Sequence, residues 1–206
     1  QEFLIAQQIE KFSIISVSGG APFALAIAHV MGDAVQKVAC IGSVGPITQS
    51  SFFYLSAQQR KFWLLQKLAP RPLLHLLFHR IWKENISKLD EFLFTKEDQF
   101  NPQDYKVLTD PILGPELMNM TKTSLQKGAG GVVEDMYVFG SPWGFNISQI
   151  KAPVTLWHGS GDNIVHKRFS KFMKMRIPNA RLRFIPNESH YSLLLNYRDQ
   201  ILEELI

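Results

Sequence analysis

The pattern of apolar and polar positions predicts alternating strands and helices at both ends of the chain. Short apolar or alternating runs predict strands at 12–17, 37–42, 152–159 and 181–186. Amphipathic or Ala- and Leu-rich stretches predict helices at about 1–11, 23–31, 167–177 and 192–206. The first strand, helix and strand follow one another directly, which implies parallel pairing and an α/β fold. The outward arginines of the last strand suit the edge of a sheet.

The middle of the chain has a different character. Two mostly helical stretches, 51–94 and 101–139, are interrupted by prolines and by the Gly128–Gly131 segment. We therefore expect three parts: a first core segment at 1–46, a helical cap or lid insertion at 47–150, and a second core segment at 151–206.

Composition excludes several classes of protein. The chain has 206 residues, 46% of them hydrophobic and 19% charged, which is typical of a folded soluble domain. Its net charge of +4 is spread over helical stretches and no nucleic-acid reading module accompanies it, so no nucleic-acid partner is expected. No export signal or membrane-spanning stretch is visible, which favours a cytoplasmic location without stable membrane insertion. The single cysteine, Cys40, lies in an apolar run and is expected to be a small core residue.

A serine stands where the first strand turns into the first helix. Ser18 is flanked two residues away by the small residues Ser16 and Gly20. This small-x-Ser-x-small pattern is the nucleophile elbow, a strained turn that lifts the serine hydroxyl clear of the sheet. The pattern also occurs in ordinary turns, so its value depends on further residues.

Two such residues follow later strands. Asp162 lies in the loop after the third predicted strand and His190 in the loop after the fourth. Parallel strands bring these loops to the same edge of the sheet as Ser18. A serine needs an imidazole to accept its proton, and a carboxylate orients that imidazole. The order Ser18, Asp162, His190 therefore predicts a catalytic triad.

On these motifs the chain resembles the α/β-hydrolase superfamily, in its esterase, lactonase and C–C hydrolase group with a helical cap. The segment Gly159–Val165 matches the acid loop of that group, Gly-x-x-Asp-x-x-Val. The resemblance implies a serine hydrolase that forms an acyl-enzyme, needs no cofactor or metal, and uses the Gly19 N–H as one half of an oxyanion hole. Three positions depart from the family pattern, because glycines are usual or common where this chain has Ser16, Asn187 and Ser189.

Several strands precede the elbow in that family, and a loop among them supplies the second oxyanion donor. Here one helix and one strand precede Ser18, so we expect a missing N-terminal segment or a dimer to complete the sheet. The alternative is a truncated or non-catalytic chain that acts as a fragment or small-molecule binding protein. As an isolated chain it is expected to be poorly soluble or catalytically weak.

Other candidate residues have simpler interpretations. His158 is expected to be a core or supporting residue rather than the base. His75 and His79 have the spacing of a zinc pair but lack a third ligand. Asp135 fits a substrate contact as well as it fits an exposed helix end. The aromatic stretches between 52 and 78 favour a small lipophilic ester or lactone as the substrate.

Overall fold

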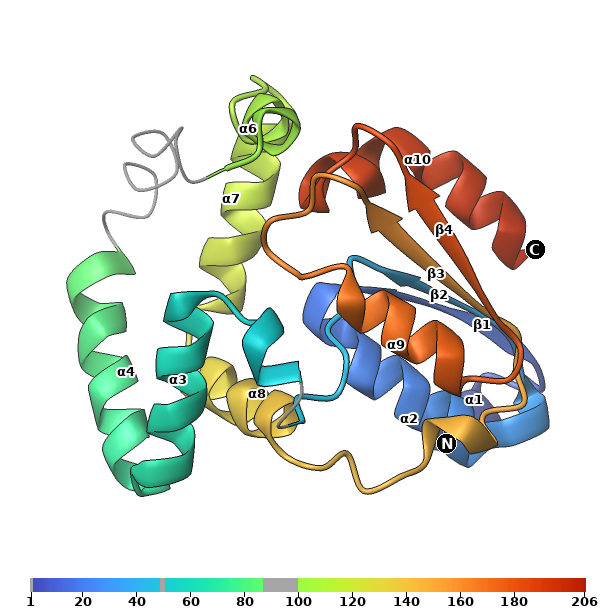
Figure 1. The fold of residues 1–206 in the computed structure, drawn as a ribbon, viewed down its shortest axis with the longest axis horizontal. Coiled ribbons are helices and arrows are strands. Elements are labelled where there is room, and N and C mark those ends of the chain that lie inside the picture. Colours follow the sequence, from blue (N-terminus) through green and yellow to red (C-terminus); the bar gives the residue numbers. More distant parts are fainter. Residues whose placement is uncertain (1, 49–50, 87–99) are drawn as a thin grey trace. The chain divides into compact units, whose positions relative to one another are not determined.

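The computed structural model describes residues 2–48, 51–86 and 100–206 (Figure 1). The chain divides into two compact units. The core unit comprises Gln1–Pro46 and Trp143–Ile206, and the helical unit comprises Ile47–Pro142. The segment 87–94, predicted to be helical, lies outside the described residues.

The core unit contains a parallel four-stranded sheet in the order β1-β2-β3-β4. Its strands are β1 Phe12–Val17, β2 Val35–Ile41, β3 Val154–Gly159 and β4 Ala180–Ile185. The register pairs Ile41 with both Val17 and Trp157, so the carboxyl ends of the strands lie at one edge. The predicted α/β class is therefore confirmed, and β4 is an edge strand as expected. β1 forms the other edge of the described sheet.

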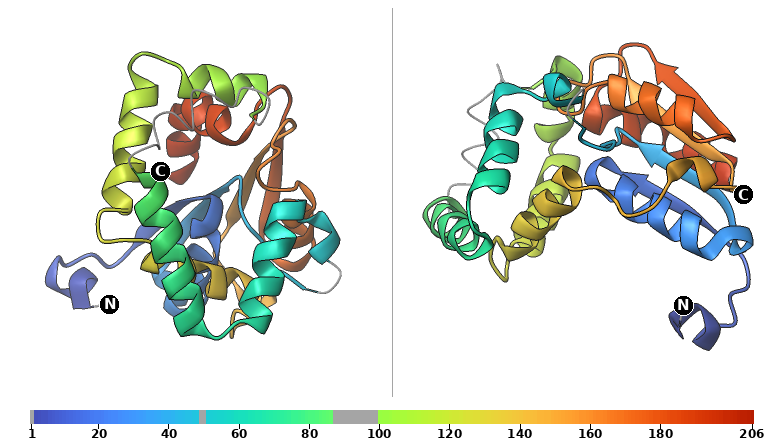
Figure 2. Two further views of the ribbon diagram at one scale, coloured as in Figure 1. Left: turned by 90° about the vertical axis from the view of Figure 1, so that its left-hand side faces the viewer. Right: turned by 60° about the horizontal axis from the view of Figure 1, so that its bottom comes forward.

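Helices cover both faces of this sheet (Figures 1 and 2). On one face lie α2 (Ala21–Met31) and α9 (Arg168–Arg176), whose Leu25 and Met173 share a buried cluster with Val38, Val154 and Leu156. On the other lies α10 (His190–Leu205), which packs Leu193 and Ile201 against Ala39, Ile41 and Trp157. The three helices thus bury the nearly continuous apolar runs that parallel strands require.

The first predicted helix is shorter than expected. α1 spans Glu2–Ala6, whereas the sequence pattern suggested a helix to about residue 11. Gln8 has a positive φ of 55°, which a helix cannot include. The apolar side chains of α1 do not support a longer helix, since Phe3 and Ile5 are 69% and 70% exposed.

The helical unit contains five described helices. These are α3 Ala57–Leu68, α4 Arg71–Asn85, α6 Pro102–Leu108, α7 Leu113–Ser124 and α8 Gly130–Gly140. α3 begins with a capping box in which Ser56 and Gln59 satisfy each other's backbone N–H groups. Aromatic pairs pack within the unit, Phe52 against Trp63 and Phe62 against Phe78.

The helical unit ends at Pro142 rather than at the predicted residue 150. Ile147 and Ile150 are buried in the cluster beneath α2 and α9, and Trp143 and Phe145 pack against that cluster. Burial of these side chains ties residues 143–150 to the core unit. Within the described ranges, no helix combines the length and the apolar character needed to cross a bilayer.

Candidate active site

Ser18 lies on a strained turn at the carboxyl end of β1. Its φ is +53°, a conformation that is rare for residues other than glycine and is typical of a nucleophile elbow. The two small flanking residues, Ser16 and Gly20, lie close together. A Cβ atom added at Gly20 would be 3.4 Å from the Cβ atom of Ser16. Ser16 is buried and its hydroxyl lies 3.4 Å from the Ala39 carbonyl. A serine therefore fits where the family usually has glycine.

The elbow leads directly into a helix. Ser18–Gly20 forms a short 3-10 turn, η1, and α2 begins at Ala21 with Pro22 in its first turn. Proline is suited to this position because its missing N–H has no partner there in any helix. Gly19, the predicted oxyanion donor, therefore lies just before a helix N-terminus, where N–H groups concentrate and the helix dipole favours negative charge.

The acid loop holds Asp162 in a fixed orientation. One carboxylate oxygen, Oδ1, accepts hydrogen bonds from the backbone N–H groups of Ile164, at 3.0 Å, and Val165, at 2.8 Å. These bonds explain the spacing of the Gly-x-x-Asp-x-x-Val pattern, since the loop closes on its own carboxylate. The Asp162 side chain is fully buried, and its second oxygen, Oδ2, points away from these donors toward His190.

His190 is the first residue of α10 and pairs with Asp162. Its Nδ1 lies 2.9 Å from Asp162 Oδ2, and its side chain is only 5% exposed. A carboxylate accepts hydrogen bonds, so Nδ1 carries the proton in the neutral ring and Nε2 is left as the acceptor. This is the tautomer that a general base requires.

The acid loop and the histidine loop are bonded to each other. Gly161 N donates to the Glu188 carbonyl at 2.8 Å, and Asn187 N donates to Ser160 Oγ at 3.0 Å. Ser189 Oγ donates to the Gly161 carbonyl at 3.1 Å. These bonds fix the Asp162 and His190 backbones relative to each other.

The two departures from the family pattern in the histidine loop are compatible with this arrangement. Asn187 has a φ of 60°, the left-handed conformation that asparagine tolerates better than most residues. Ser189 is the N-cap of α10 and forms a capping box with Ser192. Its hydroxyl also bonds the acid loop, which a glycine would not do.

A residue that the sequence did not single out connects Ser18 with the His190–Asp162 pair. Gly42, directly after β2, has a φ of +52°, and a Cβ there would lie 2.9 Å from His190 Nδ1 and 3.3 Å from Asp162 Oδ2. Two residues later, Val44 N donates to the Ser18 carbonyl at 3.1 Å. The segment after β2 thus contacts all three predicted triad positions. The sequence feature that could have identified Gly42 is a glycine directly after the strand that pairs with the elbow strand, β1.

The other candidates have different environments. His158 is fully buried on β3, as predicted. His75 pairs with Glu134 at 2.9 Å in the helical unit, and no cluster of three His, Cys, Asp or Glu side chains suited to a metal occurs within 2–48, 51–86 and 100–206. Burial raises the pKa of Asp135. Cys40 is a buried core residue, and burial raises its pKa to about 11.

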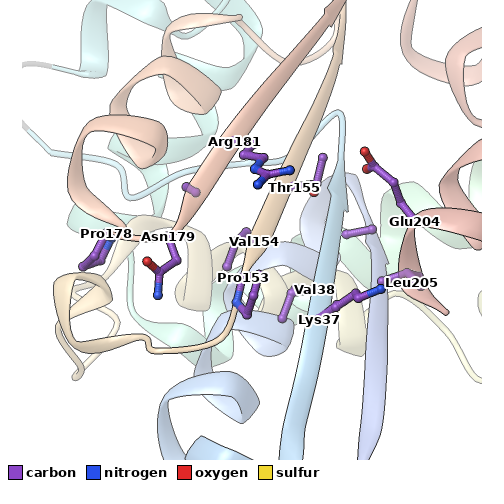
Figure 3. A pocket seen from close by; sticks show the side chains of 12 residues that line it. Lys37, Val38, Pro153, Val154, Thr155, Pro178, Asn179, Arg181, Glu204 and Leu205 are labelled. Atoms are coloured by element: carbon purple, nitrogen blue, oxygen red, sulfur yellow. The ribbon is translucent and has the colours of Figure 1, made fainter.

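A cavity of about 550 Å³ lies at the opposite end of the sheet (Figure 3). Lys37, Thr155 and Arg181, from the amino-terminal halves of three strands, line it together with Glu204 from the end of α10. The triad positions are at the carboxyl ends of the strands, so this cavity is not part of the candidate active site.

Sequence comparison gives limited information. No family model matches the chain. A segment of 57 residues is 32% identical to a protein of Arabidopsis thaliana described as probable lysophospholipase BODYGUARD 3. The match covers 28% of this chain and 11% of that protein.

Solved structures resemble nearly the whole chain. A bromoperoxidase from Bacillus anthracis superimposes with a TM-score of 0.65 at 18% identity, over 98% of this chain and 68% of its own. An α/β-hydrolase fold protein from Nakamurella multipartita has a TM-score of 0.61 at 16% identity, over 98% and 72%. An esterase from Exiguobacterium antarcticum has a TM-score of 0.61 at 16% identity, over 99% and 68%. The chain has the α/β-hydrolase fold.

Proposed function

We propose that the chain is a serine hydrolase that cleaves an ester or lactone. The observation that carries the proposal is the buried His190–Asp162 pair, held at 2.9 Å on the edge of the sheet where the strained Ser18 turn lies. Hydrolase-type neighbours of known structure agree with this class of activity. In this proposal His190 Nε2 serves as the base, and the elbow supplies the nucleophile.

The proposed reaction uses four groups of this chain. Ser18 Oγ attacks the acyl carbonyl while His190 Nε2 takes the hydroxyl proton, and Asp162 stabilises the imidazolium. The Gly19 N–H stabilises the negative charge on the carbonyl oxygen. The C–O bond to the leaving group then breaks and His190 returns the proton to the departing oxygen. Water, deprotonated by His190, then attacks the acyl-enzyme. The bond between the acyl carbon and Ser18 Oγ breaks, His190 returns the proton to Oγ, and the acid is released.

The proposed substrate is small, uncharged and lipophilic. Support comes from the aromatic side chains of the helical unit, where Phe52 packs against Trp63 and Phe62 against Phe78. Comparison of p-nitrophenyl acetate with the octanoate ester tests this preference, which predicts the higher kcat/KM for the longer acyl chain. The reverse order would point to a short, polar acyl group.

Labelling of Ser18 tests the reaction itself. A fluorophosphonate probe should label the wild-type chain, and the Ser18→Ala variant should neither be labelled nor hydrolyse esters above about 10⁻⁴ of the wild-type kcat. Ser13→Ala is the matched control, because Ser13 lies on β1, the strand that leads into the Ser18 turn, and its hydroxyl donates to the Leu205 carbonyl. Equal labelling of the Ser18→Ala and wild-type chains would contradict the proposal.

One observation favours the second candidate, a binding protein on a hydrolase scaffold. β1 is an edge of the described sheet, and the Ile15 side chain on it is 45% exposed, although this strand carries the nucleophile position. A further strand, from a second copy or another segment, is the proposed partner of this edge. Since loss of one oxyanion donor costs about 10²–10³ in turnover, catalysis without that partner is expected to be weak. Light scattering combined with ester turnover across a range of protein concentrations separates a dimer from a monomeric binder.

A further inference from the structure

The buried imidazole of His158 approaches the same Asp162 oxygen as His190 does. His158 Nδ1 is 2.9 Å from Ser170 Oγ on α9, and its ring stacks on Phe184 of β4 at an interplanar angle of 9°. Its Nε2 is 3.9 Å from Asp162 Oδ2, the same oxygen that accepts from His190. Among the described atoms Nε2 has no hydrogen-bond partner.

The contacts decide which ring nitrogen carries the proton. Burial lowers the pKa of His158, against weaker opposing effects of the Asp162 charge and of the Val165 backbone, so the neutral ring predominates at pH 7. A proton on Nδ1 would leave a lone pair of Nε2 facing a buried carboxylate, which is unfavourable. The Ser170 hydroxyl can rotate to donate to Nδ1, so the other tautomer loses no hydrogen bond. The proton therefore lies on Nε2, directed at Asp162.

We propose that His158 is a positioning residue that, through its Nε2–H, holds Oδ2 of Asp162 in line with His190 and moderates the charge that His190 experiences. The proposal rests on the triad assigned above. At 3.9 Å the contact is electrostatic rather than a full hydrogen bond, but the Asp162 side chain is fully buried and solvent does not screen it. Ser170, itself buried, fixes the ring through Nδ1.

This arrangement affects the basicity of His190 in a definite direction. A donor facing Asp162 weakens the attraction of the carboxylate for a proton on His190. Removing that donor should raise the pKa of His190, so the acid limb of the kcat/KM profile moves to higher pH. The titratable groups that act on His158 are Asp162, His190 and His166. All variants at position 158 therefore keep His166, so that its contribution is the same in each.

Three variants separate positioning from packing. His158→Gln keeps an N–H donor near the Nε2 position, His158→Asn keeps only the Ser170 contact, and His158→Phe keeps the ring without a donor. The Gln variant should retain the wild-type acid limb. The Asn and Phe variants should shift it upward by about 0.5 pH and lose about tenfold in kcat with little change in KM.

Titration of the His190 ring by NMR, in histidine-labelled protein, measures the same pKa without turnover. A raised His190 pKa in the Asn and Phe variants supports positioning even if the wild-type chain hydrolyses no ester, an outcome that overturns only the proposed function. An unchanged His190 pKa in these folded variants overturns the positioning role. If neither folds, Ser170→Ala replaces them. It removes the donor to Nδ1, and it should shift His190 in the same direction by less.

Discussion

Gly42 lies directly against His190, so that a Cβ atom at position 42 would stand 2.9 Å from the Nδ1 atom that faces Asp162. The position combines two demands, a φ of +52° and a lack of space for any side chain. A glycine meets both. The end of β2 thereby fits against the imidazole without displacing it from its carboxylate.

The Gly42→Ala substitution should impair activity far more than stability. The left-handed backbone costs an alanine about 1 kcal/mol, and the added methyl group must displace His190 or Asp162. A displacement near 1 Å is enough to lower kcat by about 10²-fold. Ester turnover and thermal unfolding measured on the same preparation separate the two effects.

Gly32→Ala is a matched control for that experiment. Gly32 has a similar φ of +50°, and a Cβ there would meet nothing within 4 Å. Because its ψ is −115°, outside the left-handed helical region, Gly32→Ala should lose stability through backbone strain alone while keeping wild-type turnover. Equal activity of the two variants would show that contact with His190 does not matter.

The Gly159→Ala substitution should loosen the acid loop from the histidine loop. A Cβ at this position would lie 2.4 Å from the Glu188 carbonyl oxygen, and backbone cannot move aside as a side chain can. We expect a loss of about 1–3 kcal/mol, measured by urea unfolding, together with reduced turnover. Gly131→Ala in α8, where a Cβ meets nothing within 4 Å, should be neutral or slightly stabilising.

The sequence predicted the sheet, and the loops in which Asp162 and His190 meet, because their signals are local. Each strand is a short apolar run, and Asp162 and His190 directly follow strands whose parallel pairing sets where the loops lie. The elbow was visible because its strain requires small residues at Ser16 and Gly20. The residues that determine strand pairing and turn conformation thus lie within a few positions of Asp162, His190 and the elbow.

Contacts between distant segments left no such signal. Gly42 was predicted only as the last residue of a strand, since the side chain it accommodates belongs to a helix near the other end of the chain. The partnership of His158 with Ser170 was equally invisible, because it joins a strand to the next helix through a buried pair of polar atoms. The end of α1 was missed because its apolar residues resemble a helix face, yet they are exposed.

The Cys40 thiol should be inert in the folded protein. Burial raises its pKa to about 11, against smaller opposing effects of Ser16 and Ser43, so little thiolate forms near pH 8. Ellman's reagent should therefore react with one thiol per chain only in denaturant. Rapid reaction of the native protein would show that the β2 core opens readily.

The buried neutral state of His158 should make stability depend on pH below neutrality. Burial lowers the pKa of His158 in the folded chain below its ordinary value of about 6.5, so below that pH the unfolded chain binds a proton that the folded chain does not. Stability from this group is complete above about pH 6.5 and is lost as the pH falls toward the folded pKa. The slope approaches about 1.4 kcal/mol per pH for one proton. Urea unfolding at a series of pH values measures it.

His158→Gln should remove that slope, because the glutamine side chain does not titrate. His166 provides a graded comparison. Burial and the charges of Arg168 and Lys167 lower its pKa too, but it is exposed, and solvent screening weakens these effects. His166→Gln should therefore flatten the same pH dependence only slightly. If the two substitutions changed the pH dependence of stability equally, His158 would have to bind its proton in the folded state as well. The ring that faces Asp162 would then be charged rather than neutral.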